Sequence, residues 1–109
     1  MDQRVQVLPD EDGVRVIVCG GEFDQDSLGL LREAGTAAVE DPGVRRIVLD
    51  VTAVAFADSS MLNLMLFLLR SGRLVLAGPV PDRLGRLLDV TAVRALFITA
   101  DGVEAARSL

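Results

Sequence analysis

The chain contains no histidine, tryptophan, tyrosine or lysine, and its single cysteine is Cys19. Without histidine it has no Ser–His or Cys–His nucleophile pair and no histidine-containing zinc site. One thiol can form neither an internal disulfide nor a multi-thiolate metal centre. All basic residues are arginines, which stay protonated and cannot act as general bases. We therefore expect no catalytic residue, metal or cofactor, and we expect Cys19, which lies in an apolar run, to be a buried hydrophobic side chain.

The chain also lacks an excess of positive charge, since its net charge is −5 at pH 7. This balance disfavours binding to nucleic acid or to an anionic membrane. The first residues are polar with no apolar segment after them, so no signal peptide is expected. The longest apolar run, at 62–69, is far shorter than the roughly 20 residues of a membrane span. We expect a cytoplasmic protein with no membrane insertion.

The length of 109 residues fits one domain, 1–109, and the hydrophobic content of 50% is enough for a core. Short apolar runs alternate with segments of helical periodicity, in the order β-β-α-β-α-β-α-β-α. The expected strands are 4–8, 14–18, 44–51, 74–77 and 95–99, and the expected helices are 28–39, 61–69, 82–90 and a short helix ending at 109. This order predicts an α/β domain with a mixed, mostly parallel sheet of four to five strands, opened by a β-hairpin.

Functional groups in such sheets gather beyond the carboxyl ends of the strands. The loop after the second strand carries Asp24, and the loop before the second helix carries Asp58, Ser59 and Ser60. Because a helix N-terminus has free N–H groups and partial positive charge, the Ser60 hydroxyl lies where a phosphate is tolerated. The simpler explanation, that Asp58 or Ser59 only caps the helix, is the commoner situation on spacing alone.

The helix at 61–69 is apolar around much of its circumference, whereas a helix on one face of a sheet is usually polar outside. One stripe contains Leu62, Met65, Leu66 and Leu69, and the residues off that stripe are Leu64, Phe67 and Leu68. The helix is therefore either deeply covered or carries an apolar patch that docks a partner.

Several segments resemble the STAS domain family. Residues 21–24 followed by Ser27 read GEFD…S, and residues 50–60 read DVTAVAFADSS, close to the family pattern D-[LV]-[ST]-x-V-x-F-[IM]-D-S-S. Residues 74–78 and 87–91 are similar to a later strand and helix end of the family. The resemblance spans nearly the whole chain, and its central segment is the most specific part.

The resemblance implies consecutive strand order, helices mainly on one face, and the role of an anti-sigma-factor antagonist. Such a protein is a phosphoprotein that regulates transcription by partner switching. Carried over, Ser60 is the phosphorylated residue and Asp24 and Asp58 flank it. Its other neighbours are Ser59, Met61, Asn63 and Leu64. The implied partners are an anti-sigma factor with serine kinase activity and a resetting phosphatase; homodimer formation is left open.

The chain departs from the family after Ser60, where the usual pattern D-S-S-G-[LMV]-G becomes Met61-Leu62-Asn63. We expect Met61 and Asn63 to place side chains where a kinase loop would approach. This departure favours a second hypothesis, a non-switching scaffold or adaptor subunit of a larger signalling or transport complex. A third hypothesis, a serine hydrolase, lacks an activating His or Lys for Ser59 or Ser60.

Overall fold

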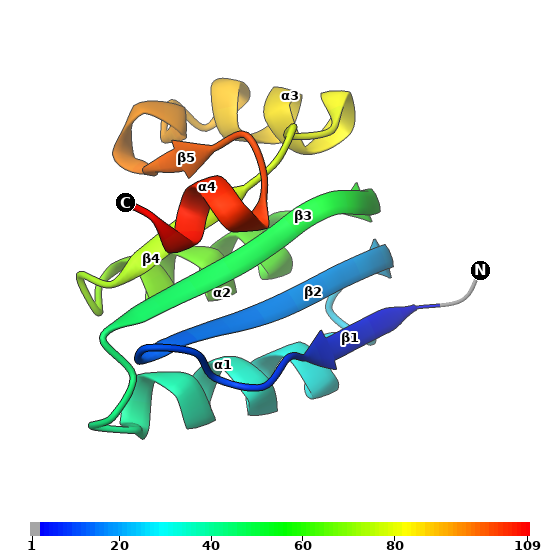
Figure 1. Cartoon of the computed structure of the whole chain (residues 1–109). Coiled ribbons are helices and arrows are strands. Elements are labelled where there is room, and N and C mark those ends of the chain that lie inside the picture. Colours follow the sequence, from blue (N-terminus) through cyan, green and yellow to red (C-terminus); the bar gives the residue numbers. More distant parts are fainter. Residues whose placement is uncertain (1–2) are drawn as a thin grey trace.

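The computed structural model describes residues 3–109 as one sheet flanked by helices (Figure 1). The strands are β1 (Arg4–Val7), β2 (Val14–Phe23), β3 (Arg46–Ala57), β4 (Leu74–Ala77) and β5 (Thr99–Ala100). The helices are α1 (Gly29–Glu40), α2 (Ser59–Leu69), α3 (Asp82–Val90) and α4 (Val103–Arg107), with a 3-10 turn at Arg94–Leu96. The expected order of elements is confirmed.

The five strands lie in consecutive order, β1-β2-β3-β4-β5. β1 pairs antiparallel with β2, with Val5 opposite Cys19, and the remaining pairs are parallel. The mixed, mostly parallel sheet opened by a hairpin is therefore confirmed.

Side chains alternate between the two faces of the sheet, as the two-residue period of strands requires. On one face Ile17, Leu49 and Leu76 join the larger core, which also contains side chains of α1, α2 and α3. On the other face Val48 and its neighbours pack with Ala106 of α4. Figure 1 shows α4 in front of the sheet and α1 and α2 behind it. The prediction of helices mainly on one face is confirmed, with α4 as the exception.

Three predicted boundaries are wrong. Residues 20–23 and 53–57 lie beyond the predicted strands 14–18 and 44–51, yet they extend β2 and β3, because they pair with each other at Gly21↔Val54 and Phe23↔Ala57. Of the predicted strand 95–99, residues 95 and 96 lie in the 3-10 turn and only Thr99 lies in β5, the two-residue strand that pairs with β4. Of the apolar residues in this segment, only Phe97 is buried in the core, with an exposure of 7%.

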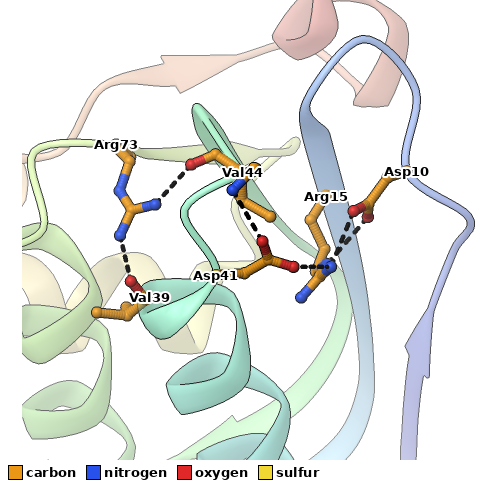
Figure 2. A network of polar contacts seen from close by, with 7 residues as sticks. Asp10, Arg15, Val39, Asp41, Val44 and Arg73 are labelled. Carbon is orange, nitrogen blue, oxygen red and sulfur yellow. Dashed lines mark hydrogen bonds and ion pairs between the residues drawn. The ribbon is translucent and has the colours of Figure 1, made fainter.

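A polar network lies at the amino ends of the parallel strands (Figure 2). The Arg15 guanidinium donates to Asp10 at 2.8 and 2.9 Å and to Asp41 at 2.9 Å, joining the hairpin turn to the end of α1. The hydrogen bond from Arg15 lowers the pKa of Asp10. Arg73 donates to the carbonyls of Val39 and Val44, at 2.6 and 2.5 Å. These contacts brace the end of the sheet opposite to the start of α2.

Candidate functional site at the start of helix α2

Asp58 caps α2 and ties two loops together. One carboxylate oxygen, Oδ1, accepts from the backbone N–H groups of Ser60 at 2.9 Å and Met61 at 3.2 Å. The other, Oδ2, accepts from the backbone N–H of Gln25 at 3.2 Å. The Asp58 backbone N–H donates to the Phe23 carbonyl at 3.2 Å. The cap predicted from the sequence is present, and it also fixes the β2–α1 loop beside the start of α2.

Asp24 is engaged within its own loop. Its Oδ1 accepts from the Ser27 hydroxyl at 2.9 Å and from the Asp26 N–H at 3.0 Å. Ser27 therefore closes this loop and does not cap α1, whose capping residue is Leu28. The two acids expected to flank Ser60 thus serve different loops, and the backbone of Gln25 connects the loops.

Ser60 lies in the first turn of α2 and is partly exposed, next to the exposed Ser59. The expectation that free N–H groups of this helix would stabilise a phosphate on Ser60 is not supported. Two of those N–H groups, from Ser60 and Met61, already donate to the Asp58 carboxylate. These two N–H groups are therefore not free to bind a phosphoryl group on the Ser60 hydroxyl.

The remaining predicted neighbours of Ser60 divide between core and surface. The prediction that Met61 lies at the surface is wrong, because its side chain is 0% exposed and belongs to the core. Asn63 is exposed, as predicted. Leu64 is 6% exposed and packs with the core.

The stripe assigned to α2 from its spacing is also wrong in part. The buried residues of the helix are Met61, Leu62, Leu64, Met65 and Leu68. Leu66 and Leu69 are partly buried, whereas Phe67 is 39% exposed. The helix is therefore largely covered, with an apolar side chain left open on one side.

That open side belongs to a hollow between α1 and α2, with a volume of about 270 Å³, which we call the α1–α2 groove. Its lining residues are Arg32, Thr36, Ser60, Asn63, Leu64 and Phe67. Arg32 is the one charged residue in the lining. Arg32 and Thr36 were not predicted from the sequence as part of the site. Their spacing of four residues places both on one helix face, but only the structure shows which helix that face meets.

Within residues 3–109, no group of three or more His, Cys, Asp or Glu side chains is arranged to hold a metal ion. Cys19 is buried as predicted, and burial raises the pKa of its thiol to about 12, with the Asp50 charge adding to the effect. No helix in the described part of the chain has the length and apolarity to cross a membrane.

A family model described as "Mlab, STAS domain" matches residues 8–100, so the chain belongs to the STAS domain family. No curated protein sequence matches the chain. An anti-sigma factor antagonist from Mycobacterium paratuberculosis shares the fold, with 22% identity, a TM-score of 0.84, and coverage of 98% of this chain and 92% of that one.

Two structures of the protein SpoIIAA are also similar, each at 21% identity. The unphosphorylated form, an anti-sigma factor antagonist, has a TM-score of 0.78, with coverage of 97% of this chain and 98% of that one. The phosphorylated form, a Bacillus cell fate determinant, has a TM-score of 0.73, with coverage of 96% and 98%. At these identities the likeness concerns the fold.

Proposed function

We propose that this protein is an anti-sigma-factor antagonist whose binding to an anti-sigma factor is switched off by phosphorylation of Ser60. The partner is an anti-sigma factor with serine kinase activity, and a phosphatase resets the switch. The chain acts in the cytoplasm as a binding protein, without a catalytic residue or cofactor of its own. The whole chain, 1–109, forms the STAS domain.

The observation that carries this proposal is the position of Ser60. Ser60 is partly exposed and lines the α1–α2 groove, while the backbone around it is held by Asp58. A hydroxyl on a rigid helix start, beside a groove with the apolar side chains of Leu64 and Phe67, is suited to both docking and modification. Ser59, its exposed neighbour, is not part of the groove lining.

The charge of the modification explains the switch. Phosphorylation adds about −1.5 to −2 charges at pH 7. The Asp58 carboxylate, which accepts from the Ser60 N–H, adds negative charge at the same helix start. An interface that excludes water would reject this charge. The similarity of the fold to SpoIIAA in both its unphosphorylated and phosphorylated forms supports a switch that leaves the architecture intact.

The proposal is tested by incubating the purified chain with ATP and the anti-sigma-factor kinases of its own organism, followed by intact-mass measurement. We expect one added phosphate in the unmodified chain and in Ser59→Ala, and none in Ser60→Ala. Ser59→Ala is the matched control because it removes the neighbouring hydroxyl from the same helix turn. Phosphate on Ser59, or on neither serine with every kinase tried, would contradict the proposal.

A second candidate is a non-switching scaffold or adaptor subunit of a larger signalling or transport complex. It is favoured by the family model, described as "Mlab, STAS domain", and by Met61, whose side chain fills core space where the family pattern has a glycine. A scaffold would remain in a stable complex when isolated from cells and would bind its partners equally well after Ser60→Asp. An antagonist would lose its partner after the same substitution.

A further inference from the structure

The charge of the α1–α2 groove is opposite in sign to that of the chain as a whole. The chain carries a net charge of −5, yet no acidic residue lines the groove and Arg32 does. Among residues 3–109, none of the ion pairs involves Arg32. Asn63 and Thr36 add an amide and a hydroxyl to the lining. The groove therefore presents a cation and neutral hydrogen-bonding groups beside the Ser60 hydroxyl.

We propose that Arg32 is the intramolecular receptor for the phosphoryl group of phosphorylated Ser60, which turns into the α1–α2 groove with Asn63 as a second donor. This inference rests on the proposed function, because it concerns the modified form of Ser60. It assigns Arg32 a role in the switch that the sequence did not suggest.

Two features direct the phosphoryl group into the groove. On the side of the helix N-terminus, the Asp58 carboxylate already accepts from the N–H groups of Ser60 and Met61, and its charge repels a phosphate. On the side of the groove, the Arg32 guanidinium offers planar N–H donors that match phosphate oxygens in pairs. The anion therefore has one repulsive neighbour, Asp58 at the helix start, and one attractive neighbour, Arg32 in the groove lining.

This placement adds a steric element to the switch. A phosphoryl group in the groove occupies space beside Leu64 and Phe67 and neutralises Arg32. A partner that docks in the groove would then lose an apolar contact and a cationic contact together. Arg32 thus couples the modification to the docking surface.

The test uses the full chain with phosphoserine installed at position 60 by genetic code expansion, so that no kinase is needed. A phosphorus NMR titration then measures the second pKa of the phosphate, which is about 6 for free phosphoserine. A nearby guanidinium favours the dianion and lowers this pKa. We expect Arg32→Gln to raise it by about 0.2 to 0.7 units, the range for a solvent-exposed ion pair. Arg32→Lys should raise it less.

Two controls define the result. Arg70→Gln removes an arginine ten residues after Ser60, at the far end of the same helix, about 15 Å along the axis and beyond the screening length of about 8 Å in physiological salt. It should leave the titration unchanged. When phosphoserine is placed at position 59 instead, Arg32→Gln should leave the second pKa of its phosphate unchanged. If the chain phosphorylated at Ser60 shows the same phosphate pKa before and after Arg32→Gln, the inference is overturned, whether or not a kinase modifies Ser60.

Discussion

Replacing Asp58 by alanine tests the structural basis of the site. The substitution removes the oxygen that caps the N–H groups of Ser60 and Met61, at 2.9 and 3.2 Å, and the oxygen that accepts from Gln25. Replacing a capping aspartate by alanine costs about 0.5–2 kcal/mol. The exposed Gln25 N–H can turn to water, so its loss adds little. We therefore expect the free energy of unfolding to fall by about 1–2 kcal/mol.

For a domain of this size, that loss corresponds to a drop in Tm of roughly 5–15 °C. Urea unfolding followed by circular dichroism gives the free energy, and a thermal scan gives the Tm. Asp58→Asn keeps a capping oxygen, so its free energy of unfolding should fall much less. Asp26→Ala, in the neighbouring loop, is the matched control, because its exposed carboxylate caps no helix. Equal stability of the Asp58→Ala and Asp26→Ala variants would refute the role given to Asp58.

Three further predictions concern the core and the amino end of the sheet. Met61→Gly, which restores the family's glycine, should cost about 3–6 kcal/mol in urea unfolding, because it empties a fully buried site and adds a helical glycine. Cys19, with a thiol pKa of about 12, should react with a disulfide reagent at about pH 8 only after unfolding, and fast reaction of the native protein would contradict this. Because Arg15 lowers the pKa of Asp10 in the folded state, this pair stabilises the protein above about pH 4 and loses its effect as the pH falls further. We therefore compare the free energy of unfolding of the wild type and of Arg15→Gln as a function of pH. The difference between the two proteins should shrink between about pH 5 and pH 2, and it should be small throughout because the pair is partly exposed.

Much of the fold could be predicted because hydrophobic periodicity and turn residues act locally. Short apolar runs rich in β-branched residues, such as 47–49, predict the strands. Helical spacing predicts the helices, as in α3, whose buried Leu84 and Leu88 are four residues apart. What failed depended on distant partners. Residues 20–23 and 53–57 are turn-like or mixed in sequence, yet they extend β2 and β3 because the two segments pair with each other in the sheet.

For the site, too, the local features were predicted from the sequence and the features that depend on packing were not. A cap at Asp58 or Ser59 was predicted because capping depends on the residues next to the helix, and the structure assigns it to Asp58. Two features depend on how α1 and α2 pack against each other. One is the burial of Met61 in the core, and the other is the presence of Arg32 and Ser60 in the lining of one groove. Both helices have apolar residues at several angles, so spacing alone does not choose the face that enters the core.

A single hydroxyl, that of Ser60, controls docking in the proposed switch, and one comparison of affinities tests this directly. The Kd of the anti-sigma factor is measured by calorimetry for the unmodified chain and for the chain carrying phosphoserine at position 60, with phosphoserine at Ser59 as the control. We predict that the phosphate on Ser60 weakens binding at least about 100-fold, since desolvating an unmatched charge at an interface costs several kcal/mol. The same affinity for the unmodified and the Ser60-phosphorylated chains would contradict the account.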